Sequence, residues 1–219
     1  TFEAPEVDEH TDIVFRVTVR DGDDFRTDEV VVHVLPVNDA PEDITFTGGS
    51  VDENAAPGTV AATAHVVDPD GGETFTYDLV DDADGRFTVD GNGQILVADG
   101  ANLDHEAAES HEVTVRATDA DGLSIDKTLI IQVGDVNEAP TAIDMTGGTV
   151  REDAPVGTVV ATLSITDADA NDTHSYELID DADGRFIVDG SGNIVLAESG
   201  SLDYESAASH EVTVRVTDS

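Results

Sequence analysis

The sequence predicts an all-β protein made of tandem Greek-key β-sandwich domains, and three observations lead to this prediction. Apolar and polar residues alternate with a period of two, as in HEVTVRAT at 111–118. Short runs of this kind are separated by Gly- and Asp-rich turns such as DGNG at 90–93. No segment keeps a helical period. Six or seven short strands per roughly 100 residues is typical of a Greek-key sandwich.

The chain repeats itself at an offset of 99 residues, which carries Asn38 onto Asn137. The same offset aligns 51–119 with 150–218 without gaps, and the linker PVNDAP (36–41) with DVNEAP (135–140). A period of this length fits whole domains strung together. The sequence therefore predicts the C-terminal part of a first repeat at 1–38, a complete repeat at 39–137, and a third repeat at 138–219 without its last strand. We expect these to belong to a longer array.

The expected strands of the complete repeat follow in chain order. TFTYDLV, RFTVD and QILVA form short strands at 74–80, 86–90 and 94–98. DGNG forms the hairpin turn between the last two, because Gly and Asn tolerate positive φ. DDADGRF, at 81–87 and again at 180–186, is expected to be a turn that leads into a strand. TLIIQV at 128–133 reads as a final strand buried on both faces.

Charge is the strongest compositional signal. The 219 residues contain 49 acids and 9 Lys or Arg, for a formal net charge of −40. This balance excludes nucleic acid and anionic membranes as partners. The β-branched alternation still favours a folded chain over a disordered one. No apolar run is long enough to span or insert into a membrane, and cysteine is absent.

Some of these acids recur at the same positions of the repeats. Acids at i and i+2 of an extended backbone point to one face, so Asp68 with Asp70, and Asp104 with Glu106, can each converge on one point. Ca²⁺ prefers six to eight such oxygen ligands, including backbone and Asn carbonyls. The remaining acids are expected to be solvated surface. DADANDTHSYEL (167–178) is similar to an EF-hand loop at its first ligands, but Asp172 and Leu178 at its sixth and twelfth positions exclude that site.

Five motifs in a fixed order make the chain resemble the cadherin repeat family over nearly its whole length. They are a Glu near the first strand (Glu53 and Glu152), LDHE and LDYE, DPD and DAD, ATD and VTD, and the linker DVNEAP. VNDAP and DADGRF are more similar to the bacterial cadherin-like modules of large surface adhesins. The resemblance implies cadherin-like, Ig-like sandwiches joined by short linkers that bind about three Ca²⁺ per complete junction.

The resemblance also implies the ligands of each junction, residue by residue. For the second junction they are Glu53, Asp104, Glu106, Asp135, Asn137, Glu138, Asp167, Asp169 and Asp218. For the first junction they are Asn38, Asp39, Asp68, Asp70 and Asp119. Pro36 stands where the family linker begins with Asp, and the L-D-x-E motif is missing before it. Glu6, Asp8 and Glu9 remain alternative ligands there.

The expected function is a calcium-rigidified spacer and adhesion module of a large cell-surface or secreted adhesin. Its partners are neighbouring repeats, with other surface proteins or polysaccharides as further candidates. The alternative is a binding module that grips a polysaccharide or protein through a sandwich face or loop end. With 3 Tyr, 7 Phe and no Trp, the chain offers few aromatic rings for stacking on sugars. An enzyme is not expected, because no catalytic motif accompanies the histidines.

Overall fold

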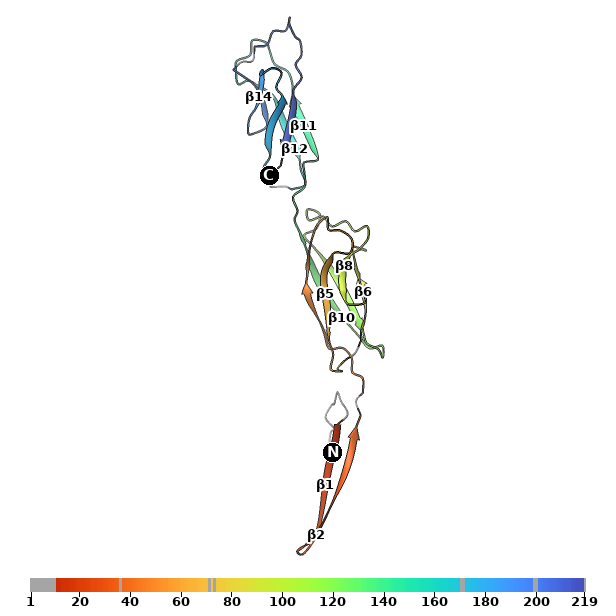
Figure 1. The fold of residues 1–219 in the computed structure, drawn as a ribbon. Coiled ribbons are helices and arrows are strands. Elements are labelled where there is room, and N and C mark those ends of the chain that lie inside the picture. Colours follow the sequence, from red (N-terminus) through yellow and green to blue (C-terminus); the bar gives the residue numbers. More distant parts are fainter. Residues whose placement is uncertain are drawn as a thin grey trace. The chain divides into compact units, whose positions relative to one another are not determined.

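All regular structure in the described part of the chain is β-strand (Figure 1). The computed structural model describes residues 11–218 except positions 36, 71, 73, 170, 171, 199 and 200. Glu6, Asp8, Glu9 and Pro36 of the first predicted junction therefore lie outside the described residues. The chain divides into two compact units, Thr1–Asp135 and Val136–Ser219. The all-β prediction is confirmed, whereas the finer division of unit 1 into two repeats stays a prediction.

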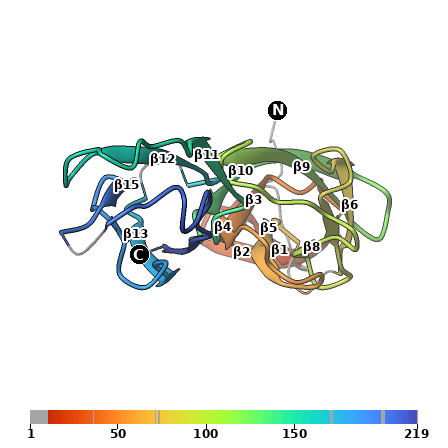
Figure 2. The same ribbon diagram turned by 90° about the horizontal axis from the view of Figure 1, so that it is seen from above.

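Unit 1 contains a sandwich of two four-stranded sheets, in the orders β4-β10-β9-β6 and β3-β5-β8-β7. Figure 2 shows β9 and β10 on one side of this sandwich and β5 and β8 on the other. The strands are β3 (Asp43–Gly48), β4 (Ser50–Asp52), β5 (Val60–Val67), β6 (Thr76–Asp81), β7 (Phe87–Val89), β8 (Gln94–Val97), β9 (Ser110–Thr118) and β10 (Ser124–Gly134).

The core between the sheets is built by the alternation that the sequence shows. In β9, the residues Val113, Val115 and Ala117 are fully buried while their neighbours are not. The larger buried side chains of the core are Ile44, Val51, Phe87, Ile95, Val97, Leu103, Val113, Val115, Ile131 and Val133. Because the apolar residues of each strand share one face, both sheets bury that face and leave the other to solvent.

The described residues of the sandwich in unit 1 form eight strands, where the sequence predicted six or seven per repeat. The first strand is split, because the chain leaves one sheet as β3 and enters the other as β4 at Gly48 and Gly49, which have φ of 86° and 117°. A Cβ on Gly48 would lie 2.8 Å from the carbonyl oxygen of Ala61. Only glycine permits this crossing, since it combines positive φ with a close backbone approach.

The prediction that 128–133 is buried on both faces is wrong. In β10, Ile131 and Val133 are 0% and 3% exposed, but Ile130 between them is 55% exposed. The reason is that β10 pairs with β4 and β9 within one sheet, of which only one face meets the opposite sheet. The run of apolar residues therefore does not mark burial on both sides.

The two turn predictions are confirmed. β7 and β8 form an antiparallel hairpin around 90–93, where the Asp90 carboxylate accepts hydrogen bonds from the amides of Asn92 and Gln94 at 2.9 and 2.8 Å. DDADGRF forms a turn that leads into β7. Ala83, Asp84 and Gly85 in this turn all have left-handed φ, and the same occurs at Ala182 in the repeated motif.

Unit 1 also contains a two-stranded antiparallel ribbon of β1 (Thr11–Asp21) and β2 (Asp24–Val34). Cross-strand pairs join its two strands, such as Arg16 Nε with a carboxylate oxygen of Glu29 at 2.9 Å. Many of its apolar side chains, including Val19 and Phe25, are more than half exposed. The ribbon coincides with the predicted end of the first repeat.

Unit 2 repeats most of this sandwich, with sheets in the orders β11-β12-β15-β14 and β13-β16. Its strands are β11 (Ala142–Gly147), β12 (Val159–Thr166), β13 (Ser175–Asp180), β14 (Phe186–Val188), β15 (Asn193–Leu196) and β16 (Thr213–Thr217). No strand among its described residues takes the place of β10. A pocket of about 400 Å³ in this unit is lined in part by Phe186, Ile194 and Val212.

Candidate metal centre

Carboxylates cluster at two places in each unit. We call each cluster an end and name it after the first of its residues in chain order. The asparagine end of unit 1 comprises Asn38, Asp39, Asp68, Asp70 and Asp119, and that of unit 2 comprises Asn137, Glu138, Asp167, Asp169 and Asp218. The glutamate end of unit 1 comprises Glu53, Asp104, His105, Glu106 and Asp135, and that of unit 2 comprises Glu152, Asp203, Tyr204 and Glu205.

In the asparagine end of unit 1, two carboxylates stand at the first residue after a strand. Asp68 follows β5 and Asp119 follows β9. The Asn38 side-chain amide donates to Asp119 Oδ2 at 3.0 Å, and the Asp39 backbone amide donates to Asp70 Oδ2 at 2.6 Å. The Asp70 amide in turn donates to Asp68 Oδ1 at 2.8 Å. The structure thus brings together all five residues predicted for the first junction.

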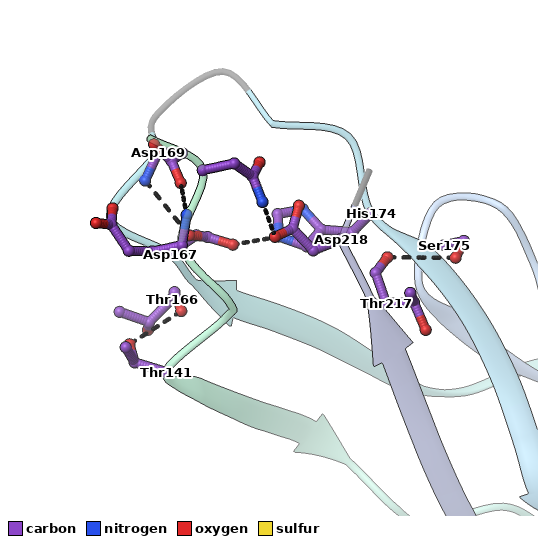
Figure 3. A network of polar contacts seen from close by, with 10 residues as sticks. Thr141, Thr166, Asp167, Asp169, His174, Ser175, Thr217 and Asp218 are labelled. Atoms are coloured by element: carbon purple, nitrogen blue, oxygen red, sulfur yellow. Dashed lines mark hydrogen bonds and ion pairs between the residues drawn. The ribbon is translucent and has the colours of Figure 1, made fainter. Parts of the chain in front are cut away.

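The asparagine end of unit 2 has the same hydrogen-bond pattern (Figure 3). The Asn137 amide donates to Asp218 Oδ2 at 2.7 Å, and the Glu138 backbone amide donates to Asp169 Oδ2 at 2.8 Å. The Asp169 amide donates to Asp167 Oδ1 at 3.3 Å. Asp167 follows β12 and Asp218 follows β16, as their counterparts follow strands in unit 1.

Burial and hydrogen bonding act in opposite directions on Asp119. Its burial, at 6% exposure, disfavours the charged carboxylate. Hydrogen bonds from Asn38 and from the backbone amides of Leu123, Gly122 and Asp121 outweigh this effect and lower the pKa of Asp119. The carboxylate is therefore held ionised, as a metal ligand must be.

One carboxylate atom in this end is buried without a partner. In the described part of the chain Asp68 Oδ2 has no hydrogen-bond partner, although its other oxygen accepts a hydrogen bond from the amide of Asp70. A buried carboxylate oxygen normally has a donor or a cation beside it. With the surrounding oxygen ligands, this free atom fits a hard divalent cation such as Ca²⁺.

The glutamate end of unit 1 is organised around the buried Glu53. Glu53 is the first residue after β4, and it is 3% exposed. The His105 backbone amide donates to Glu53 Oε2 at 2.7 Å, and the Ala107 amide donates to Asp104 Oδ1 at 2.8 Å. Ligand atoms of His105, Glu106 and Asp135 all lie within 4.8 Å of one another. The four unit 1 residues predicted for the second junction thus share one end of this unit.

His105 in this end was not predicted from the sequence as a site residue. Its Nδ1 lies 2.8 Å from the carbonyl oxygen of Val133. That hydrogen bond raises the pKa of His105, against the opposing effect of burial, and the negative charges of Asp135, Glu106 and Glu109 raise it further. The imidazole thus responds to the same negative field that would attract a cation.

The glutamate end of unit 2 repeats this arrangement on the surface. The Tyr204 backbone amide donates to Glu152 Oε2 at 2.8 Å, as the His105 amide does to Glu53. Ligand atoms of Glu152, Asp203 and Glu205 lie within 4.8 Å of one another, and all three residues are exposed. The sequence showed these three only as repeat counterparts, outside the predicted junctions.

Two residues of unit 2 join the asparagine end without having been predicted there. His174 Nε2 lies 2.7 Å from Asp167 Oδ2. The pKa of Asp172 is raised, first by its hydrogen bond to Asp218, then by burial and by the charges of Asp218, Asp169 and Asp167. Asp172 was noticed only in the excluded EF-hand pattern, and His174 falls in no motif. The only feature of the sequence that could have identified them is that both follow Asp167 closely along the chain.

Comparison with known proteins shows the family to which this chain is similar. A model of the Cadherin domain matches residues 48–134 and 147–219. Human Protocadherin Fat 1 is 31% identical over 97% of this chain and 5% of its own length, and chicken Cadherin-1 is 32% identical over 86% and 24%. The chain thus spans at most about a quarter of the length of these two relatives.

The fold has close counterparts among solved structures. Extracellular cadherin domains 1–4 of Protocadherin Gamma B7 superpose with a TM-score of 0.67 at 24% identity, covering 96% of this chain and 56% of that one. The β-sandwich prediction and the resemblance to cadherin repeats are confirmed, and so is the expectation that these domains are not an enzyme. The finer resemblance to bacterial modules is not borne out, since the relatives named above are animal proteins.

Within the described ranges, none of the elements is a helix with the length and apolar character that crossing a bilayer requires.

Proposed function

This chain belongs to the cadherin domain family, and on that premise we propose that it is a calcium-binding, calcium-rigidified extracellular spacer and adhesion module. One observation carries the proposal. The asparagine ends of both units hold an Asn amide and three carboxylates in the same hydrogen-bond pattern, with two of the carboxylates placed directly after strands. Repetition at two sites favours a shared ligand over a chance grouping of surface acids.

The proposed calcium ligands are those that the resemblance implies. The second junction uses Glu53, Asp104, Glu106, Asp135, Asn137, Glu138, Asp167, Asp169 and Asp218, and the first uses Asn38, Asp39, Asp68, Asp70 and Asp119. A complete junction would hold about three Ca²⁺, which together carry about +6 charge. Bound calcium would supply positive charge, and each ion would be coordinated by six to eight oxygen atoms.

The residues around these ligands prepare the oxygens in advance. The amides of Asn38 and Asn137 orient Asp119 and Asp218. The backbone amide of the next residue orients Asp70 or Asp169 in the same way. This preorganisation lowers the entropy that the carboxylates lose when they converge on a cation.

The mechanical consequence is a linker whose stiffness depends on calcium. Without a cation, carboxylates of consecutive repeats repel one another across a short linker. When the repulsion is neutralised and both repeats contribute ligands, the linker loses its freedom and consecutive repeats form a rod. A stiff rod presents an adhesive surface at a fixed distance from its anchor.

Small-angle X-ray scattering tests the mechanical part. We expect EDTA to broaden the distribution of distances within the chain and to lower its melting temperature relative to excess CaCl₂. Asp104→Ala should reproduce part of this change in calcium, whereas Asp99→Ala, which removes an exposed acid outside the proposed sites, should not. Scattering curves that coincide with and without EDTA would refute a calcium-dependent linker.

Isothermal calorimetry tests the binding part. Calcium titration should show several sites for the unaltered chain, fewer for Asp104→Ala, and an unchanged number for Asp99→Ala. Equal isotherms for all three proteins would remove Asp104 from the ligand set. Heat that persists while the scattering stays constant would keep calcium binding but reject the rigid spacer.

The proposed location is extracellular, on a surface-anchored or secreted parent protein. The proposed partners are neighbouring repeats and other cell-surface proteins, including cadherin domains. The polysaccharide alternative has no support among the relatives, and the scarcity of aromatic residues also disfavours it.

A further inference from the structure

The two asparagine ends differ at one position that touches a ligand carboxylate. The offset of 99 residues places His174 of unit 2 where unit 1 has Phe75. His174 Nε2 lies 2.7 Å from Asp167 Oδ2, and the two side chains are 13% and 6% exposed. The counterpart atom in unit 1, Asp68 Oδ2, is buried and has no hydrogen-bond partner within the described ranges of that unit. The same atom thus faces an imidazole nitrogen in unit 2 and no described donor in unit 1.

The histidine completes a set of three ligand atoms of mixed type. One atom each from Asp167, His174 and Asp218 lies within 4.8 Å of the others (Figure 3). Donors bound at about 2.0–2.1 Å to a tetrahedral Zn²⁺ are themselves about 3.3 Å apart, so the ring and carboxylates need only small shifts to surround an ion. An imidazole nitrogen with carboxylate oxygens suits Zn²⁺, whereas Ca²⁺ prefers oxygen alone.

A second, independent observation points to a cation at the same place. Asp172 Oδ2 is buried and has no hydrogen-bond partner among the residues that the structure describes. A buried carboxylate oxygen normally has a hydrogen-bond donor or a cation beside it, so this atom points to a cation at the same place.

We propose that the asparagine end of unit 2 is a site for Zn²⁺, or a chemically similar divalent transition-metal ion, bound through Asp167, His174 and Asp218. The asparagine end of unit 1 lacks this site because Phe75 offers no ligand atom. Asp172 stands close enough to Asp218 to serve as a fourth ligand or to hold the metal-bound water. The site goes beyond the proposed calcium function and competes with it for Asp167 and Asp218.

The test uses the whole 219-residue chain, stripped of metal with EDTA and dialysed. Titration with ZnCl₂ in a calorimeter gives affinity and stoichiometry, and titration with Co²⁺ gives visible absorption bands that report nitrogen and oxygen ligation. We expect His174→Phe to weaken the tightest zinc site by about tenfold or more and to remove its cobalt bands. Calcium titration of the same variant should still show binding, which verifies that the end remains folded.

Two further variants separate this site from other imidazoles. His105 also lies beside carboxylates, so His105→Tyr, which installs the residue found at that position in unit 2, should leave the His174-dependent site intact. Phe75→His should create a second site of the same kind beside Asp68. Zinc affinity and cobalt spectra that are unchanged in His174→Phe would overturn the proposal and leave the His174–Asp167 contact as a structural hydrogen bond.

The outcomes for zinc and calcium are distinguishable. Zinc binding that depends on His174 in a chain with no calcium response would support the zinc site and reject the calcium function. Calcium binding that is retained while zinc binding does not depend on His174 would do the reverse.

Discussion

At the scale of single residues, the two asparagine ends contain carboxylates whose surroundings favour different charge states. Asp119 is buried yet its pKa is lowered, because Asn38 and three backbone amides hydrogen-bond its carboxylate. Asp172 shares a hydrogen bond with Asp218 among other carboxylates, and its pKa is raised. The same residue type is therefore prepared as an anion where amide donors surround it, and disfavoured as an anion where it is buried among other carboxylates.

A substitution at Gly48 tests whether the chain needs glycine where it crosses from the sheet of β3 to the sheet of β4. Gly48→Ala should lower the free energy of unfolding by about 2–4 kcal/mol, because Ala disfavours positive φ and its Cβ would press on the Ala61 carbonyl. Gly91→Ala, where a Cβ meets open space, is the control and should leave stability nearly unchanged. Urea unfolding measures both. Equal midpoints for the two variants would contradict the steric argument.

Asp90 gives a residue-scale prediction on pH. The pKa of this carboxyl is lowered, first by the backbone hydrogen bond from Gln94, against a small effect of burial, and then by Asn92. A lowered folded pKa means that the group stabilises the fold above its unfolded pKa, and that this contribution disappears as pH falls through the folded pKa. NMR titration should place the pKa of Asp90 below the ordinary value of an aspartate carboxyl.

The variant Asp90→Asn completes this test. Its unfolding free energy should depend less on acid pH than that of the unaltered chain, because the titrating group has gone. Asp99→Asn serves as the matched change in charge. A parallel loss of stability on acidification in Asp90→Asn and the unaltered chain would show that the turn hydrogen bonds do not govern this dependence.

At the scale of elements, β10 completes the sandwich of unit 1. In unit 1 it covers the core, and Ile44 is 1% exposed, whereas its counterpart Ile143 in unit 2 is 44% exposed. β9, which pairs with β10 along its whole length, spans Ser110–Thr118, but β16 spans only Thr213–Thr217. The residues preceding Thr213 have no strand partner there and remain irregular.

Substitutions of two neighbouring isoleucines in β10, Ile130 and Ile131, test whether only one face of this strand is buried. Ile131→Ala should lower the free energy of unfolding by about 2–5 kcal/mol, because the side chain is fully buried and leaves a cavity. Ile130→Ala, on the exposed face, should cost less than about 1 kcal/mol. Chemical denaturation of both variants checks the difference. Similar losses would instead favour burial on both faces.

At the scale of the whole molecule, net charge dominates. A formal charge of −40 on 219 residues creates long-range repulsion that opposes compact structure. Most of these acids lie outside the two kinds of ends, so metal ions at the ends would neutralise only part of the repulsion. The rest depends on screening by mobile ions.

Salt should therefore stabilise the chelated chain. Raising NaCl from about 0.02 M to about 0.5 M in EDTA should raise the melting temperature by several degrees, because the Debye length falls well below the spacing of distant charges. Choline chloride at equal ionic strength should have the same effect. A rise with sodium alone would indicate specific ion binding, and an unchanged melting temperature would show that repulsion contributes little.

The sequence by itself determined the β class, the repeat, the hairpin at 90–93 and the residue types that gather at the ends. These features depend on the period of apolar residues, on the spacing of motifs and on the residues in turns. All three are local properties and can therefore be recognised in the sequence alone. Only the tertiary structure decided that the first strand changes sheets at Gly48, that Ile130 faces outward, and that His174 and Asp172 reach Asp167 and Asp218. The first two outcomes depend on which surfaces meet across the sandwich. The third depends on how the ends of different strands come together, and strand period and turn chemistry specify neither.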